Sequence, residues 1–215
     1  MKILTKALSF ALCVFCISAK PRPLSANKKG GSREKIITIS YLLDGNGFQN
    51  QDASNDSKVK HWLQDVHKEA QTLLKQQTKA EIKFEIINIS LTDNELTKNL
   101  LSWTSAGSCG SESLMHAGMV LGEVKLQSTY WPLRPHVICV LTKLKLYQDD
   151  LINLLGYAMH KTLCITTVPM LLTYNLENVK ETGNLLSELV INSDCNNRRM
   201  FDDQYAKRLS RPKSF

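Results

Sequence analysis

Histidines are the residues of this 215-residue chain best suited to bind a metal ion, and there are five: His61, His67, His116, His136 and His160. A zinc-protease helix needs two histidines four residues apart, because four steps of about 100° return to the same helix face. His61 and His67 are six residues apart, so we expect surface side chains that point to different sides of one helix. The other three are isolated, and their spacing predicts no metal site.

Nucleophilic catalysis finds equally little support in the sequence. No G-x-S-x-G motif occurs, and Gly110-Ser111 beside Cys109 is typical of a turn. Cys139 lies within an apolar run, which favours a disulfide or a buried thiol over a nucleophile. The chain has no glycine-rich phosphate loop, and its aromatic residues do not alternate with basic ones, so we expect no nucleic-acid partner.

The first nineteen residues have the composition of a secretory signal peptide. Two lysines precede a short apolar segment, residues 8–17, and the small residues Ser18 and Ala19 suit cleavage. The apolar segment is shorter than the roughly 20 residues that span a bilayer, and no later stretch approaches that length. We therefore expect a secreted, extracellular protein without a membrane span.

Cleavage after residue 19 would leave four cysteines: Cys109, Cys139, Cys164 and Cys195. In a secreted chain they predict two disulfides, with three possible connectivities. No pair has the C-x-x-C spacing of a metal site. We favour Cys164–Cys195 and Cys109–Cys139, because the first bridge would join the end of the last helix to the preceding strand.

Two sequons are candidate glycosylation sites. They are Asn55-Asp56-Ser57, in a polar segment, and Asn88-Ile89-Ser90, at the end of a predicted strand. Glycosylation of Asn88 requires its side chain to face solvent.

Charge is distributed unevenly along the chain. Residues 20–35, a leader that we expect to be flexible, carry six basic side chains and one acidic one. Residues 198–215, a basic C-terminal tail, carry six basic and two acidic, whereas residues 36–197 carry 13 basic and 17 acidic. Basic tails on a mildly acidic domain could attract an anionic glycan such as heparin.

Residues 36–197 have the periodicity of one mixed α/β domain. The expected strands are 36–43, 82–91, 136–142, 165–168 and 170–173, the last two flanking Pro169. The expected helices are 57–77, 96–103, 112–126 and 175–195, while 143–155 is ambiguous. This order predicts a mostly parallel twisted sheet with packed helices, and a parallel crossover between the first two strands.

The last of these helices is amphipathic. Its expected apolar stripe is Val179, Leu185, Leu186, Leu189 and Val190. The residues expected to face away from the core are Lys180, Glu181, Asn184, Ser187 and Glu188. Asn178 followed by Glu181 approximates a capping box.

Order and residues together resemble the catalytic domain of reprolysin-type (ADAM-like) metzincin metalloproteases, particularly the short secreted forms from tick saliva. The segment 155–164, LGYAMHKTLC, is similar to the family's Gly-x-Ala segment, with Gly156, Ala158 and Cys164 in matching places. The family's zinc helix carries H-E-x-x-H-x-x-G-x-x-H-D, and residues 183–194, GNLLSELVINSD, share its apolar frame and final Asp194. The resemblance implies a metzincin-like N-terminal subdomain, with the family's C-terminal subdomain largely missing.

The chemical residues of the family motif are replaced in this chain. Gly183, Ser187 and Ser193 stand where the three zinc ligands are expected, Asn184 stands at the general base, and Val190 stands at the turn glycine. Glycine and serine do not replace imidazole as a zinc ligand, and an amide cannot act as a base. The resemblance therefore implies no catalytic residue, no bound metal and no cofactor.

These features predict a secreted, catalytically inactive metalloprotease-like protein that binds an extracellular or host protein. One alternative is an active secreted zinc metalloendopeptidase, with unusual ligands from His116, His136 or His160 near Glu181 or Glu188. Another is a heparin- or glycan-binding protein that acts through its basic tails.

Overall fold

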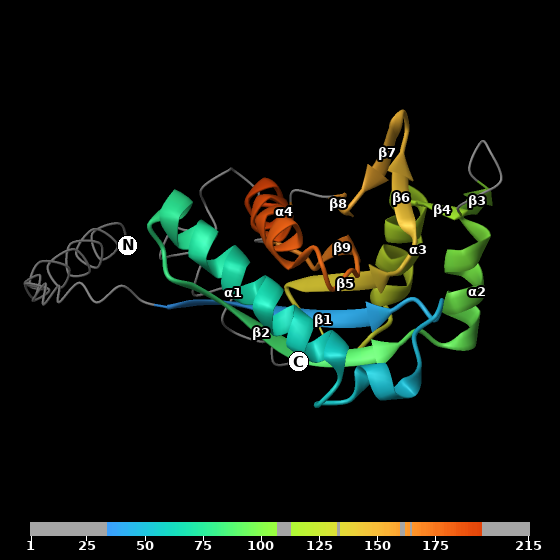
Figure 1. The fold of residues 1–215 in the computed structure, drawn as a ribbon, viewed down its shortest axis with the longest axis horizontal. Coiled ribbons are helices and arrows are strands. Elements are labelled where there is room, and N and C mark those ends of the chain that lie inside the picture. The colour runs from blue at the N-terminus through green and yellow to red at the C-terminus, as the bar shows by residue number, and fades with distance from the viewer. Residues whose placement is uncertain (1–33, 107–112, 133, 160–161, 164, 195–215) are drawn as a thin grey trace, which may run out of the picture. The chain divides into compact units, whose positions relative to one another are not determined.

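The computed structural model describes residues 34–106, 113–132, 134–159, 162–163 and 165–194 (Figure 1). Strands and helices follow one another as a mixed α/β fold with two sheets and four α-helices in this part of the chain. The fold class predicted from the sequence is confirmed. The predicted signal peptide, the leader up to residue 33 and the C-terminal tail lie outside the described residues, as do Cys109, His160, Cys164 and Cys195.

The larger sheet has the strand order β2-β1-β5-β9-β8. Its strands are β1 (Lys35–Leu43), β2 (Ile82–Leu91), β5 (Val137–Thr142), β8 (Gly156–Ala158) and β9 (Val168–Thr173). All neighbours are parallel except β8, which runs antiparallel to β9. Helix α1 (Lys58–Thr78) leads from β1 to the parallel strand β2, so the predicted crossover is confirmed.

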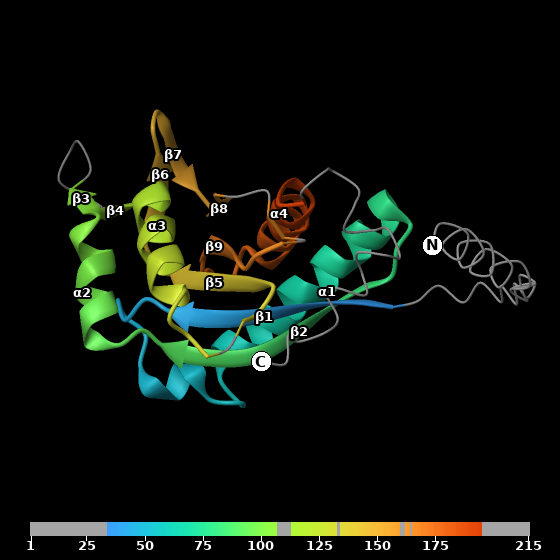
Figure 2. The same ribbon diagram turned by 180° about the vertical axis from the view of Figure 1, so that it is seen from behind.

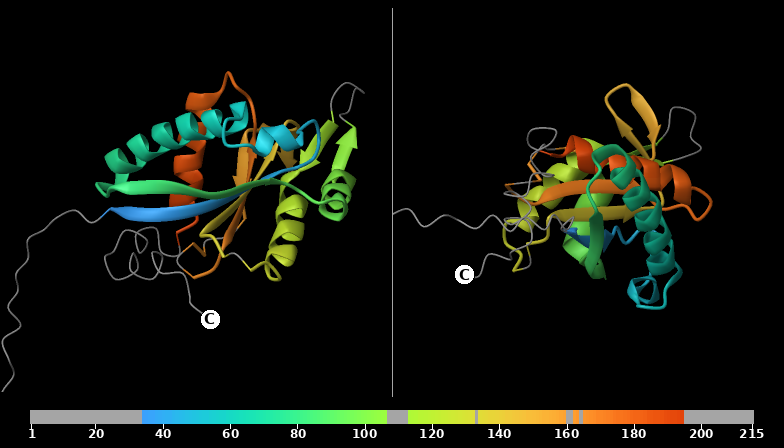
Figure 3. Two further views of the ribbon diagram at one scale, coloured as in Figure 1. Left: turned by 90° about the horizontal axis from the view of Figure 1, so that it is seen from below. Right: turned by 90° about the vertical axis from the view of Figure 1, so that its left-hand side faces the viewer.

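Helices cover both faces of this sheet. On one face, α1 and α4 (Val179–Asn192) pack against side chains such as Cys139 and Leu141 of β5. On the other face, α2 (Asn94–Ser102) and α3 (Ala117–Ser128) pack against the alternate residues Ile138 and Val140. Figure 3 (left) shows α1 above β1 and β2, and α4 and α3 on opposite sides of the central strands. Because β5 is buried on both faces, its sequence is a continuous apolar run.

A smaller sheet has the order β3-β4-β6-β7. Its strands are β3 (Thr104–Ala106), β4 (Ser113–His116), β6 (Lys145–Gln148) and β7 (Leu151–Leu154). A short 3-10 helix, η1 (Asn50–Ala53), precedes α1. β6 and β7 form a hairpin that projects from the rest of the domain, as Figures 1 and 2 show from opposite sides. The segment that was ambiguous in sequence is therefore a β-hairpin.

Two predicted elements differ in the structure. The helix expected over 112–126 begins only at Ala117, because 113–116 pair as β4 and bury Met115 in the second core. The strand pair expected around Pro169 is one strand, β9. The N–H of Val168 bonds to His136 on the β5 side, so the missing N–H of Pro169 faces the β8 side. On that side β8 pairs only with residues 170–172, so no sheet hydrogen bond is lost at Pro169.

Within the described residues, no helix combines the length and apolarity needed to cross a membrane.

Candidate functional site

Helix α4, whose sequence resembles a zinc helix, packs along α1. It begins after Asn178, whose side chain makes no capping hydrogen bond, so the predicted capping box is wrong. Its buried residues are Thr182, Gly183, Leu186, Ser187 and Val190. Leu186 and Val190 confirm part of the predicted apolar stripe, whereas Leu185 and Leu189 are half-buried. The buried side includes small and polar residues because another helix, rather than the sheet alone, covers it.

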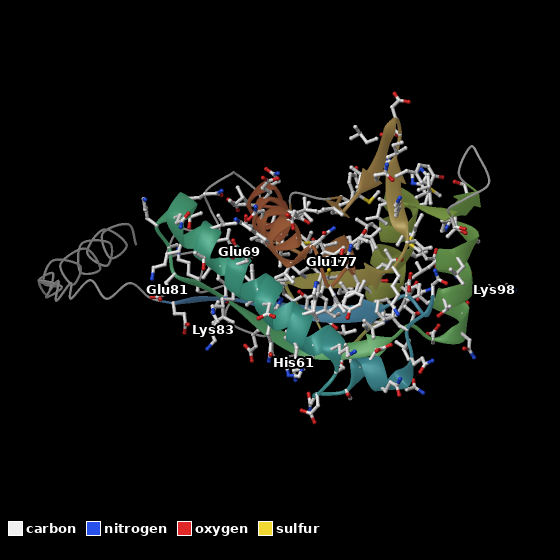
Figure 4. All side chains as sticks on the ribbon, viewed as in Figure 1. His61, Glu69, Glu81, Lys83, Lys98 and Glu177 are labelled. Carbon is white, nitrogen blue, oxygen red and sulfur yellow. The ribbon has the colours of Figure 1, made fainter. Side chains whose placement is uncertain are left out.

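Gly183, which the resemblance aligns with the family's first zinc ligand, packs closely against Val66 and Glu69 of α1. A Cβ atom added at Gly183 would be 2.6 Å from Cβ and 2.8 Å from Cγ of Glu69, and 3.2 Å from the carbonyl oxygen of Val66. Glu69 is labelled on α1 beside α4 in Figure 4. The first of these distances is shorter than non-bonded carbon atoms allow, so the two helices approach closely because residue 183 has no side chain.

The other replaced positions do not converge on one point. Ser187 is buried, and its Oγ donates to the carbonyl oxygen of Asn184 at 2.7 Å in its own helix. Our expectation that Ser187 faces away from the core is therefore wrong. The Asn184 side chain is exposed, and Ser193 is buried at the C-terminal cap. Gly183 and Ser187 are buried in the packing of α4, and Ser193 forms its C-terminal cap.

Zinc does not fit the residues at these positions. A catalytic zinc ion needs three nitrogen, sulfur or oxygen ligands around an open fourth position. Gly183 has no side chain, α1 fills the space beside it, and the hydroxyl of Ser187 donates to a carbonyl of its own helix. Among the described residues, no group of three or more His, Cys, Asp or Glu side chains is placed to hold a metal ion.

Two of the three histidines considered for an alternative zinc site, His116 and His136, are far apart, and the third, His160, lies outside the described residues. His116 caps the start of α3, where its Nδ1 accepts the N–H of Met119 at 3.4 Å. His136 lies beyond the other end of α3, a helix of 12 residues and therefore roughly 18 Å long. Glu181 and Glu188 belong to α4, on the opposite face of the sheet from α3. These side chains cannot ligate one ion.

His136 is also occupied by a structural contact. The ring Nδ1 of His136 accepts the backbone N–H of Thr38 at 2.8 Å, and the backbone N–H of His136 donates to Thr38 Oγ1 at 3.1 Å. These bonds join the start of β5 to β1 just before the two strands pair. The lone pair of this nitrogen is therefore not available to a metal ion.

A second histidine lies in the core, where we had expected a surface residue. His67 is buried, and its Nε2 is 2.6 Å from the hydroxyl of the fully buried Tyr41. Burial lowers the pKa of His67 to about 4 and raises the pKa of Tyr41 well above its usual value. One side of His67 lines a groove of about 380 Å³ between α1 and β2. His61, by contrast, is exposed, as predicted.

Cys139 is a free, buried thiol on β5, with its neighbour Tyr41 directly across on β1. Burial raises the pKa of this thiol, so it is a poor nucleophile. The sequence also led us to favour a bridge between Cys139 and Cys109, and the structure shows no such bridge at Cys139. Cys139 is buried in a central strand that helices cover on both faces. The Cys164–Cys195 bridge stays a prediction.

Asp44 is a buried carboxyl group at the carboxyl end of β1. Its Oδ1 accepts the N–H of Asn46 at 2.9 Å, while Oδ2 has no hydrogen-bond partner among the described residues. Burial raises the pKa of Asp44 to about 6, against the opposing effects of the nearby Thr142 hydroxyl, the Asn46 N–H and the charge of Lys143. Sequence reasoning missed this group because nothing in an Asp-Gly turn indicates burial.

The tip of the β6–β7 hairpin presents exposed apolar side chains. Leu151 and Ile152 are each 62% exposed, next to the exposed acidic residues Asp149 and Asp150 of the turn. Asp149 adopts a left-handed conformation, with φ of 52°, which the two-residue turn requires. Adjacent large apolar side chains on a projecting element are a typical binding surface.

Both glycosylation candidates face solvent. Asn55 follows η1 and Asn88 lies on β2, and their exposed side chains line the same groove.

Comparison with known proteins adds no family. No protein-family model matches the chain, and no curated protein matches it. The functional interpretation therefore rests on the geometry of the chain itself.

Proposed function

We propose that this chain is a secreted metalloprotease-like protein that does not hydrolyse peptides and acts by binding an extracellular or host protein. The order of β1, α1, β2, β5, β8, β9 and α4 supports the relationship, because it follows the order on which the resemblance to reprolysin-type proteases rests. Helix α4, which the resemblance aligns with the family's zinc helix, packs against α1, and this supports a role in binding rather than in catalysis.

One observation carries the proposal: Gly183 lies in van der Waals contact with α1. A histidine at this position would have to displace the Val66 carbonyl oxygen or the Glu69 stem, both of which belong to the body of α1. The space that a first zinc ligand would occupy is therefore filled by another helix. Restoring the replaced side chains would therefore not be enough to restore a zinc site, because α1 would also have to move away from α4.

The β6–β7 hairpin is the surface that best suits protein binding. Leu151 and Ile152 can bury their apolar area in a partner, and each would contribute about 1–3 kcal/mol if fully desolvated. Asp149 and Asp150 beside them favour a partner pocket with a basic rim. The expected partner is thus an extracellular protein with an apolar pocket flanked by Lys or Arg.

Zinc content and peptidase activity test the loss of catalysis. The secreted chain should contain far less than one zinc per molecule by elemental analysis. It should also leave a broad panel of peptide and protein substrates uncleaved, under conditions where an active zinc endopeptidase cleaves them. Stoichiometric zinc, or cleavage that a chelator abolishes, would refute the proposal.

Binding is tested on an array of purified extracellular proteins. A specific partner should bind the wild-type chain and lose at least tenfold in affinity for the Leu151→Ala/Ile152→Ala variant. The Leu126→Ala variant is the matched control, because Leu126 is 60% exposed near the C-terminal end of α3, whereas the hairpin contacts the N-terminal end through Gln148 and Gly118. Equal loss in both variants, or no loss in either, would remove the hairpin from the proposal.

A further inference from the structure

The two sequons, 33 residues apart in sequence, meet on one surface of the domain. A groove of about 300 Å³ is lined by the loop after η1 and by β2, and both Asn55 and Asn88 contribute to it. Lys60 of α1 lines the same groove and donates to Asn55 Oδ1 at 2.5 Å. That contact uses the amide oxygen of Asn55, whereas a sugar is attached to the nitrogen, Nδ2.

A β-bulge turns Asn88 toward solvent. Ile39 of β1 pairs with Ile86 and Ser40 pairs with Asn88, so Ile87 is an extra residue in β2. Side chains alternate along a strand, and Ile86 points to the α1 side. Without the extra residue Asn88 would point the same way. With it, Ile89 packs against the core and Asn88 is exposed, which is the condition for glycosylation.

β2 is also an edge strand, and across the groove it faces the loop after η1. It is ten residues long and pairs with β1 on one side only. Near its start the edge is covered, because Gln71 of α1 accepts the N–H of Phe84 at 2.6 Å. Farther along, Ile87 is 38% exposed beside Asn88. Exposed edges of this length tend to pair with strands of other molecules unless something covers them.

We infer that Asn55 and Asn88 both carry N-linked glycans, and that the two glycans cover the β2 edge around 86–89 and prevent pairing with a second copy of the chain. The inference rests on the proposed secretion. In the secretory compartment, Nδ2 of each asparagine attacks C1 of an oligosaccharide carried on a polyprenyl pyrophosphate. The new C–N bond replaces the C–O bond to the pyrophosphate, which leaves, and Nδ2 loses one proton.

Glycan occupancy is tested on the full chain secreted from eukaryotic cells. Intact-mass measurement before and after enzymatic deglycosylation should show two glycans on the wild-type chain, one on Asn55→Gln, one on Asn88→Gln and none on the double variant. Asn50→Gln is the matched control, because Asn50 is exposed in η1 but is not in a sequon, and it should keep both glycans. Occupancy below about a tenth at either site in the secreted protein overturns the inference.

The covering role is tested by size-exclusion chromatography with light scattering. The wild-type chain should stay monomeric, and the double variant should move toward twice the monomer mass as its concentration rises. Adding Ile87→Lys to the double variant should restore the monomer, because a charge on the edge opposes pairing. Circular dichroism shows whether each variant is folded. A folded double variant that stays monomeric at every concentration overturns the covering role.

The same experiment separates this inference from the proposed function. A chain that stays inside the cell with residues 1–19 attached contradicts secretion itself. A chain that is secreted and unglycosylated contradicts only the inference about the glycans.

Discussion

Replacing Gly183 by alanine measures how closely α1 and α4 approach each other. In an open helix, Gly→Ala raises the free energy of unfolding by about 1 kcal/mol, because alanine loses less backbone entropy. At Gly183 the new methyl group would meet Glu69 Cβ at 2.6 Å and the Val66 carbonyl oxygen at 3.2 Å. Such overpacking costs about 1–3 kcal/mol. We therefore expect Gly183→Ala to lower the free energy of unfolding by up to about 2 kcal/mol.

Gly122 provides a control of the same residue type. It lies inside α3, and a Cβ atom added there would have no heavy atom within 4 Å. Gly122→Ala should therefore raise the free energy of unfolding by about 0.5–1 kcal/mol. The difference in the free energy of unfolding between the two alanine variants measures the cost of the contact between α1 and α4, because the gain in backbone entropy is common to both. This difference should be about 1–3 kcal/mol in favour of Gly122→Ala.

Urea unfolding followed by circular dichroism is the assay, with the m value as a check that the folded states are comparable. A double-mutant cycle with Glu69→Gly sharpens it, since removing the Glu69 stem should recover part of the loss at Gly183→Ala. Equal stabilisation by the two alanine substitutions would refute close packing at Gly183. It would also remove the observation on which the loss of catalysis is proposed.

Three further measurements test other parts of the structure. His67 binds its proton more weakly in the folded state (pKa about 4) than in the unfolded state (about 6.5), so it lowers the free energy of unfolding as pH falls from 6.5 to 4. Asp44 binds its proton more tightly when folded (pKa about 6, against 3.8), so it raises that free energy as pH falls from 6 to 4. The two effects, each about 3 kcal/mol, should nearly cancel in the wild type. As pH falls from 6.5 to 4, the free energy of unfolding should therefore rise for His67→Gln, which keeps only the Asp44 effect, and fall for Asp44→Asn, which keeps only the His67 effect. Parallel pH profiles of the two variants would contradict both assignments. Cys139 should resist alkylation in the folded chain and react fully in urea, as mass spectrometry of its peptide can show. Trp62→Phe should lower the free energy of unfolding by about 1 kcal/mol, because Trp62 Nε1 donates to the Asn175 carbonyl oxygen at 2.8 Å, and an unchanged urea midpoint would count against that bond.

Periodicity predicted the elements whose structure depends mainly on their own sequence. The bounds of β2 agree residue for residue with the prediction, and α1 begins after Ser57, whose hydroxyl accepts the N–H of Lys60 as an N-cap. The β-branched run of β1 and the amphipathic pattern of α1 leave little choice of structure. The class of the fold follows from the alternation of such elements.

Positions that depend on a distant partner were not predictable in this way. His67 is polar in sequence, and only the approach of Tyr41 gives its ring a hydrogen-bond partner in the core. Ser187 was assigned to the exposed face because a stripe of leucines defined the buried one, whereas α1 buries the side with small residues. The exposure of Leu151 and Ile152 at the hairpin tip, and the groove that Asn55 and Asn88 share, likewise depend on the tertiary fold and could not be predicted from local sequence.

The extra residue at Ile87 has a consequence for comparing this chain with relatives. In a sequence that lacks one residue at this point of β2, the four positions 88–91 would exchange faces while their letters stayed the same. The asparagine of the sequon would then point into the core, and its isoleucine would point to solvent. A relative with a one-residue gap there could match the N-x-S motif and still have its asparagine on the buried face. An alignment of this strand should therefore check which face each residue occupies as well as residue identity.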